Sequence, residues 1–277
     1  MNWKKLLVGT WSWKRPFYSL GGIYLLLLFC VLLGADALIF QPPRSQFEKP
    51  NEHFSTIPST SGDTISIYSR EPAGGMPILL WSHGNAEDLR YLYPLLDDLN
   101  EFGFGILAYD YPGYGLSTGK PNEKACYQAI KAAYDHLIAA GHKPERILAV
   151  GQSVGSGPTC WLAENEKLAG VTLIAPFVST FRTVTRIPLF PNDRFVNIDR
   201  IGNIKQPTLF IHGTADRVVT HWNSEKLYAE SGAEDKELFS ISGAGHNDLW
   251  NTHSTAVLLK LEDFAAKVYE RGEVLNR

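Results

Sequence analysis

A serine between two glycines occurs twice in the pattern G-x-S-x-G, at Ser117 and at Ser153. Such a pattern lets a strand turn sharply into a helix, because side chains at the glycine positions would clash, and it lifts the serine hydroxyl above the sheet edge. An apolar run at 147–150 directly precedes the second pattern and a helical run follows it, whereas Ser117 leads into a turn at 119–121. We therefore predict that Ser153 is a nucleophile and that Ser117 belongs to a glycine-rich loop near the site.

A serine hydroxyl is a poor nucleophile until a neighbouring base accepts its proton. His246 lies in the glycine-rich stretch GAGHND (243–248) after the last apolar run, where its ring could reach Ser153. His83 and His212 end strands that read as buried, and we expect them to brace neighbouring loops. The remaining histidines lie outside any such pattern: His53, His136, His142, His221 and His253.

The base needs a carboxylate that fixes its tautomer and stabilises the imidazolium. Asp216 follows the apolar run 208–212 by a few residues and is our prediction for this acid. Asp110 also ends a strand, but it precedes Ser153 and opens the turn sequence YPGYG. Asp248 lies two residues after His246 and is expected to pin that loop. The resulting order is serine, acid, histidine, which differs from the orders in chymotrypsin and subtilisin.

Two backbone N–H groups are predicted to bind the oxyanion. One is that of Val154, the residue after the nucleophile, which also opens a helix whose positive end points at the developing charge. The other is that of Asn85, in the sequence His83-Gly84-Asn85 after the apolar run 78–81, where Gly84 permits close approach. The alternative is that this second loop is only a turn.

The elements that position these residues alternate along the sequence: short β-branched runs are followed by longer amphipathic stretches. This alternation predicts an α/β fold of the α/β-hydrolase type, with a mostly parallel central sheet flanked by helices and ligands bound beyond the carboxyl ends of the strands. Pro158 falls near the first turn of the helix after Ser153, where a missing N–H costs little. The expected strands are 64–68, 78–81, 105–109, 147–150, 171–175, 208–212 and 237–241, and the expected helices are 87–100, 122–140, 154–165, 224–231 and 253–269.

Composition and charge exclude several classes of protein. The 277 residues are 44% hydrophobic and 20% charged, which excludes disordered, collagenous and coiled-coil chains. Three cysteines are too few for a disulfide scaffold and lack metal-ligand spacing. The net charge is −3 although the first forty residues are basic, so the body of the chain is acidic and nucleic acid is not an expected partner. Phosphate-loop, dinucleotide and metal motifs are lacking, and no cofactor and no metal is predicted.

The stretch 20–35 (LGGIYLLLLFCVLLGA) carries no charge and lies in an apolar segment of about 24 positions, enough for a membrane-spanning helix. We predict an anchor helix at about 18–40 within an anchor segment 1–40, a linker at 41–60 and a hydrolase domain at 61–277. A cleaved signal peptide is the alternative, because Ala35-Asp36-Ala37 has the small-x-small form of a cleavage site. A buried helix of a soluble domain is a third interpretation.

Residues flanking this segment predict its orientation. Aromatic rings precede it, as they do at membrane interfaces, and the excess of basic residues ahead of it favours a cytoplasmic N-terminus with the hydrolase domain on the non-cytoplasmic side. The aromatic residues are Trp3, Trp11, Trp13 and Tyr18, the preceding basic residues are Lys4, Lys5, Lys14 and Arg15, and the following ones are Arg44 and Lys49.

About 30 residues separate the expected strand 171–175 from the expected strand 208–212. A crossover helix uses about half of such a connection, so only a minimal lid is expected. An open site beside a bilayer would suit acyl chains or exposed ester and thioester groups, and the expected partners are a small-molecule or acylated substrate and the membrane itself.

Over about residues 60–270 the chain resembles the α/β-hydrolase superfamily. The segments HGNAED (83–88), DYPGYGLSTGKPNE (110–123), GQSVGSGPT (151–159), HGTADRVV (212–219) and GAGHND (243–248) are similar to its membrane-anchored subfamily that includes protein depalmitoylases. The resemblance implies the triad Ser153, Asp216 and His246. The mammalian depalmitoylases of that group attach through an N-terminal cysteine cluster, in whose place this chain has the apolar segment, so only serine hydrolase chemistry is carried over.

The sequence thus predicts a membrane-anchored serine hydrolase that cleaves carboxylic esters or thioesters through an acyl-enzyme. Peptidase or amidase activity on the same fold is the alternative among enzymes, and a serine at the nucleophile position argues against a dehalogenase. A non-catalytic binding protein is the alternative outside enzymes, although all three triad members are present in the expected order.

Overall fold

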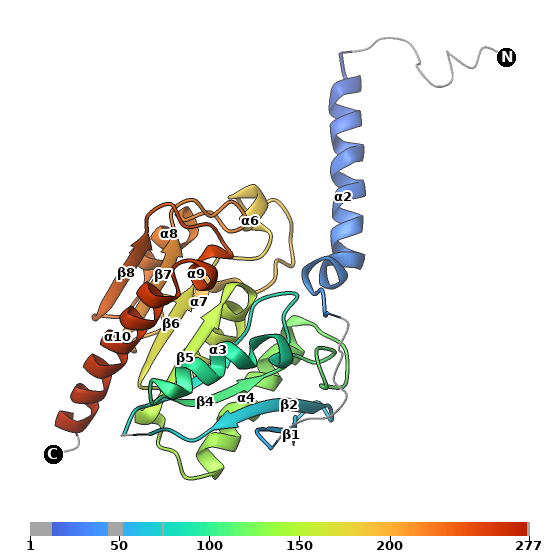
Figure 1. The fold of residues 1–277 in the computed structure, drawn as a ribbon. Coiled ribbons are helices and arrows are strands. Elements are labelled where there is room, and N and C mark those ends of the chain that lie inside the picture. Colours follow the sequence, from blue (N-terminus) through green and yellow to red (C-terminus); the bar gives the residue numbers. More distant parts are fainter. Residues whose placement is uncertain (1–12, 44–51, 74, 276–277) are drawn as a thin grey trace.

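The computed structural model describes residues 13–43, 52–73 and 75–275, with side-chain surroundings up to Tyr269. Its centre is an eight-stranded sheet in the order β1-β2-β4-β3-β5-β6-β7-β8 (Figure 1). β1 pairs antiparallel with β2 and β2 pairs antiparallel with β4, whereas all pairs from β4 to β8 are parallel. The strands are β1 (Phe54–Pro58), β2 (Thr64–Arg70), β3 (Ile78–Ser82), β4 (Gly105–Tyr109), β5 (Ile147–Gln152), β6 (Gly170–Ile174), β7 (Thr208–Gly213) and β8 (Lys236–Ile241).

Helices cover both faces of this sheet, because the central strands are apolar on both sides. Alternate residues of β3 enter different cores: Leu80 packs on the face of α4 and α5, and Leu79 packs on the face of α3 and α10. The predicted α/β-hydrolase architecture is confirmed. The helices are α2 (Arg15–Ile39), α3 (Leu89–Glu101), α4 (Glu123–Ala139), η1 (Pro144–Arg146), η2 (Ser153–Gly155), α5 (Ser156–Asn165), α6 (Arg182–Thr185), α7 (Asn197–Arg200), α8 (Trp222–Glu230), α9 (Asp248–Asn251) and α10 (Ser254–Leu275).

All seven expected strands and all five expected helices are present, with shifted ends in every case except β4, and β1 is an additional strand. β1 lies inside the segment 41–60 that was expected to be a linker. It pairs with β2 over five residues and buries Phe54 and Ile57, so its apolar side chains add an edge strand to the sheet. Pro58 ends it, as suits a residue without a backbone donor on an edge strand.

The long connection from β6 to β7 also differs from expectation. In place of one crossover helix it contains two single-turn helices, α6 and α7. Pro188 and Pro191 lie between them, and proline cannot continue a helix because it lacks the backbone N–H. Most of this connection is therefore irregular chain that lies over the carboxyl ends of the strands.

The apolar helix α2 projects away from the sheet, with its C-terminal end at the domain that contains the sheet (Figure 1). It is long and apolar enough to cross a membrane, with a mean hydropathy of 2.4, a test that a signal sequence also passes. Only 6% of its apolar window is buried, so the interpretation as a buried core helix is wrong. Several flanking residues on which the orientation prediction depends lie outside the described residues: Trp3, Lys4, Lys5, Trp11, Arg44 and Lys49.

Candidate active site

Ser153 lies at the turn between β5 and α5 and has a φ of +50°, a conformation uncommon for a residue other than glycine. The flanking glycines make this turn possible. A Cβ on Gly151 would lie 2.6 Å from the carbonyl oxygen of Gly155, and one on Gly155 would lie 2.1 Å from that of Ser82. The single turn η2 precedes α5, so Pro158 is the third residue of α5 and needs no intrahelical acceptor.

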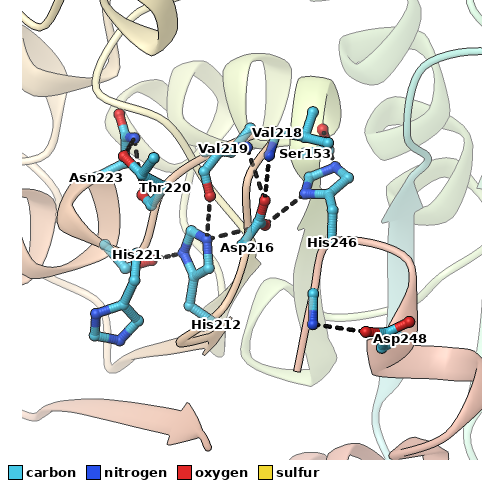
Figure 2. A network of polar contacts seen from close by, with 12 residues as sticks. Ser153, His212, Asp216, Val218, Val219, Thr220, His221, Asn223, His246 and Asp248 are labelled. Atoms are coloured by element: carbon cyan, nitrogen blue, oxygen red, sulfur yellow. Dashed lines mark hydrogen bonds and ion pairs between the residues drawn. The ribbon is translucent and has the colours of Figure 1, made fainter. Parts of the chain in front are cut away.

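Three side chains from three strand ends meet at this turn (Figure 2). Nε2 of His246 lies 3.2 Å from Oγ of Ser153, and Nδ1 of His246 lies 2.6 Å from Oδ2 of Asp216. A carboxylate only accepts, so Nδ1 carries the proton and the unprotonated Nε2 faces the serine hydroxyl. This is the arrangement needed for His246 to remove a proton from Ser153.

Backbone hydrogen bonds join the loops that carry Asp216 and His246. The N–H of Ala215 donates to the carbonyl oxygen of Ala244 at 3.0 Å, and a Cβ on Gly213 would lie 2.3 Å from that same oxygen. The expected role of Asp248 is confirmed, because its Oδ2 accepts the N–H of Gly245 at 2.8 Å. The spacing between acid and imidazole is thus set by the backbone.

Asp216 is held as an anion by several donors. Its Oδ1 accepts the N–H groups of Val218 and Val219 at 2.8 and 2.9 Å, and Oδ2 contacts both His246 and His212 (Figure 2). Burial by itself raises the pKa of Asp216, but the hydrogen bonds from the two histidines and from Val219, together with the charge of His246, bring it well below its ordinary value. Asp216 therefore remains ionised across the neutral range.

A cavity of about 360 Å³ opens in front of Ser153. The predicted oxyanion donors Asn85 and Val154 both line it, and within the described residues neither backbone N–H donates to a protein acceptor. Its wall comes from six parts of the chain. The remaining lining residues are Ile39, Gly84, Ala86, Glu87, Gln152, Phe177, Thr180, Thr183, Val218, Val219, His246 and Asn247.

Glu87 adds a carboxyl group to this cavity. Its Oε2 accepts the N–H of Gly84 at 2.9 Å, and Ala86 between them has a φ of +57°. Burial raises the pKa of Glu87, against the lowering effects of the Gly84 hydrogen bond and the charge of His246. The side chain therefore shapes the loop that carries Asn85.

The other serine and acid of the sequence hold structural positions. Oγ of Ser117 accepts the N–H of Ser66 at 2.8 Å and donates to the carbonyl oxygen of Asp110 at 3.0 Å, so it joins β2 to the loop after β4. Oδ1 of Asp110 accepts the N–H of Leu89 at the start of α3 at 2.9 Å. Neither lines the cavity, as described above, and neither contacts Ser153.

His83 braces the loop after β3, as expected. It is fully buried, its Nδ1 lies 2.7 Å from the carbonyl oxygen of Gly84, and its Nε2 lies 3.6 Å from Oδ1 of Asp110. Burial lowers the pKa of His83 to about 4 and raises that of Asp110 well above its ordinary value. His83 is therefore neutral in the folded protein at neutral pH.

Three features of the site were not predicted from the sequence: the contact of His212 with Asp216, the carboxyl of Glu87 and the presence of Ile39 in the cavity wall. His212 stands four residues before Asp216, and this i, i+4 spacing at a strand end was the available signal for the first. Glu87 lies within the quoted segment HGNAED, but its role depends on a turn at Ala86. Ile39 lies 46 residues before Asn85 in the sequence, and no local pattern predicts the contact between them.

Comparisons with known proteins point to the alpha/beta hydrolase fold. A family model described as alpha/beta hydrolase fold matches residues 77–195, and one described as serine aminopeptidase, S33 matches residues 197–252. The chain is 39% identical over 183 residues to alpha/beta hydrolase domain-containing protein aho-3 of Caenorhabditis elegans, covering 62% of this chain and 52% of that protein. It is 36% identical over 207 residues to alpha/beta hydrolase domain-containing protein 17B of Homo sapiens, covering 72% and 70%.

The chain spans 52% and 60% of the length of the first two curated relatives it matches. Among solved structures, an esterase of Pyrococcus furiosus superposes with a TM-score of 0.68 at 18% identity, covering 82% of this chain and 99% of that one. At this identity the likeness concerns the fold.

Proposed function

Because the chain belongs to the alpha/beta hydrolase family, we propose that it is a serine hydrolase that cleaves carboxylic esters or thioesters through an acyl-enzyme. One observation carries the proposal: Ser153, His246 and Asp216 form a continuous hydrogen-bonded chain at the floor of an open cavity. The hydrolases and esterases among its relatives and structural neighbours support the same chemistry.

In the proposed mechanism, Oγ of Ser153 attacks the acyl carbon while Nε2 of His246 takes the hydroxyl proton. The N–H groups of Asn85 and Val154 bind the oxyanion of the tetrahedral intermediate. Collapse breaks the bond to the leaving alkoxide or thiolate, which receives the proton from His246. A water molecule then attacks the acyl-enzyme by the same route and releases the acid and free Ser153.

We further propose that α2 anchors the enzyme in a membrane, with the N-terminus cytoplasmic and the catalytic domain on the other side. Exposed apolar side chains along α2 support this, among them Leu25, Leu26 and Phe29. A site beside such a helix is suited to acyl chains, and an apolar substrate is consistent with Ile39, Phe177 and Val218 in the cavity wall. The proposed substrate is therefore a lipid ester or an acylated thiol.

A peptidase or amidase is the second candidate, favoured by the match of residues 197–252 to the serine aminopeptidase model. Purified full-length protein should be assayed against matched esters, thioesters and amides with acyl chains of graded length. Turnover of esters and thioesters that is retained beyond acetate supports the first proposal, whereas preferred amide turnover supports the second. A steady decline beyond acetate counts against a membrane-derived acyl substrate.

Labelling with a fluorophosphonate probe tests the nucleophile. We expect Ser153→Ala to abolish labelling and ester turnover, while Ser117→Ala, which alters the other G-x-S-x-G sequence, retains both. Far-ultraviolet circular dichroism and melting temperature verify that both variants fold. Labelling that survives in Ser153→Ala would contradict the proposal.

A further inference from the structure

The C-terminal end of α2 reaches the wall of the catalytic cavity. Ile39, the last residue of α2, lines the cavity, and the next residue, Phe40, is 4% exposed. The ring of Phe40 packs edge-on against Phe195 with centroids 6.0 Å apart. The apolar helix is therefore joined to the catalytic domain at the site itself.

Residues 39–41 bind the side chain of Asn85, whose backbone N–H is the proposed oxyanion donor. Nδ2 of Asn85 donates to the carbonyl oxygen of Ile39 at 2.6 Å, and Oδ1 accepts the N–H of Gln41 at 3.1 Å. The hydroxyl of Tyr114 completes this arrangement, because it donates to Oδ1 of Asn85 at 2.8 Å and accepts the N–H of Gln41 at 2.9 Å. Donors and acceptors match at every contact, so the amide has one orientation.

The loop at Asn85 needs such support. The following residue, Ala86, has a φ of +57°, and a non-glycine residue keeps such a conformation only where its surroundings enforce it. Oδ1 of Asn85 also accepts the N–H of Ala86 at 3.0 Å, so the amide held by residues 39–41 in turn fixes the strained peptide. The direction of the Asn85 N–H depends on this turn.

Further contacts hold α2 on the other side of the cavity. Asp36 pairs with Arg194 at 2.9 Å, and the hydroxyl of Tyr24 donates to the carbonyl oxygen of Leu189 at 3.0 Å, with the ring of Tyr24 stacked on Phe190. These partners belong to the connection from β6 to β7, whose residues Thr180 and Thr183 line the cavity. The position of α2 is thus tied to both walls of the site.

We propose that residues 36–41 are a positioning element of the active site, which aims the Asn85 N–H at the oxyanion through the side chains of Asn85 and Tyr114. This inference rests on the proposed serine hydrolase function. A donor displaced by about 1 Å can cost up to about 100-fold in rate. On this basis the helix that would hold the enzyme at a membrane also completes its catalytic geometry.

Two substitutions in full-length protein in detergent micelles test the proposal with a short-chain, water-soluble ester, for which membrane delivery is irrelevant. Tyr114→Phe removes the bridging hydroxyl, and Phe40→Ala removes the ring that seats the helix end. Each should lower kcat about 10-fold, with KM within about 2-fold of wild type, because oxyanion binding acts on the transition state. The affinity of an alkyl boronic acid, which forms a tetrahedral adduct with the serine, should fall in parallel with kcat.

Matched controls separate positioning from general damage. Tyr134→Phe removes a hydroxyl that donates to the carbonyl oxygen of Lys167, and Leu38→Ala truncates an exposed side chain on the same helix end. Both should keep wild-type kcat and boronate affinity. In the double variant of Phe40 and Tyr114, the losses should be less than multiplicative because both act through Asn85.

Unchanged kcat and boronate affinity in a folded Tyr114→Phe would overturn the inference, as would losses that appear in KM alone. If Phe40→Ala fails to fold, kcat and boronate affinity of Tyr114→Phe alone still test the positioning role. The outcome is separate from the proposed function: turnover that persists in Ser153→Ala would overturn that function, whereas a dead Ser153→Ala with a fully active Tyr114→Phe would overturn only the positioning role.

Discussion

His212 and His246 contact the same carboxylate oxygen of Asp216, with Nε2 of His212 at 3.2 Å and Nδ1 of His246 at 2.6 Å from Oδ2. Nε2 of His212 also lies 2.8 Å from the carbonyl oxygen of Val219, and Nδ1 lies 2.6 Å from Oγ of Ser224. Two acceptors at Nε2 place the proton there, so the Ser224 hydroxyl donates to Nδ1. His212 therefore holds the acid from the side opposite His246.

Removal of this support should impair catalysis. We expect His212→Phe to lower kcat/KM about 10- to 100-fold, because Asp216 loses a hydrogen bond that fixes its position. The measurement is kcat/KM at neutral pH, with His212→Gln, which keeps a donor, as the control; equal values for His212→Phe and wild type would contradict the prediction.

Asp216→Asn should be the more damaging change. An amide at this position cannot accept the Nδ1 proton in the same way, and the imidazole is then free to adopt the tautomer that carries its proton on Nε2. We expect kcat to fall about 10⁴-fold with KM little changed, as an equivalent substitution in a serine protease does. Steady-state kinetics and slowed fluorophosphonate labelling measure this, and near-normal turnover would exclude Asp216 as the orienting acid.

Gly155 is a position where one methyl group should disturb the site. Its Cβ would lie 2.1 Å from the carbonyl oxygen of Ser82, a backbone atom that cannot move aside without displacing β3. Gly155→Ala should therefore lower both kcat and melting temperature, since Val154 next to it carries a proposed oxyanion donor. Gly202→Ala is the control, because its Cβ would meet its nearest neighbour at 3.7 Å. A fully active, stable Gly155→Ala would show that the turn tolerates more movement than the structure indicates.

The sequence was sufficient to predict seven of the eight strands and to place Ser153, Asp216 and His246 at one edge of the sheet, because each lies within a few residues of a strand end. Parallel strands bring their carboxyl ends to one edge, so a local pattern translates into a place in space. The same reasoning failed between β6 and β7, where the length of the connection suggested one crossover helix. The structure instead has two single-turn helices, which Pro188 and Pro191 separate.

Contacts between distant segments could not be predicted in this way. The bond from Asn85 to Ile39 joins the loop of a proposed oxyanion donor to a helix whose composition alone indicates that it could cross a membrane. Phe40 reads as the last residue of an apolar run, and nothing in its neighbours distinguishes a lipid contact from its packing on Phe195. Such pairs depend on how the segments meet, which periodicity does not encode.

His83 provides a test of stability against pH. Its pKa is lowered to about 4, so between about pH 6.5 and pH 4 the unfolded chain binds a proton that the folded protein does not. Stability should therefore fall as the pH falls through this window, by up to about 3 kcal/mol from this ring. Urea unfolding in detergent at pH 7 and pH 4.5 should show a larger loss for wild type than for His83→Gln.

The groups that face His83 are Asp110, Tyr111 and Tyr114, and all three are present in both proteins. The raised pKa of Asp110 acts in the opposite sense, since a buried neutral carboxyl favours the folded state at low pH. The difference between wild type and His83→Gln therefore isolates the ring. Equal losses in the two proteins would mean that His83 is protonated in the folded state.

The anchor proposal predicts that charge within α2 releases the protein from membranes while the site remains intact. Leu26 and Leu27 are exposed and lie more than two turns before Asp36, so the double substitution Leu26→Lys and Leu27→Lys leaves the contacts of residues 36–41 unaltered. Each lysine at the centre of a spanning helix costs about 2.5–3.5 kcal/mol of insertion. We expect the variant to move from the membrane pellet to the soluble fraction, with wild-type turnover of a short water-soluble ester. A variant that stays in the pellet after an alkaline wash would show that α2 is not the anchor. Thr255→Lys plus Leu259→Lys, at two exposed neutral positions of α10, controls for the same added charge.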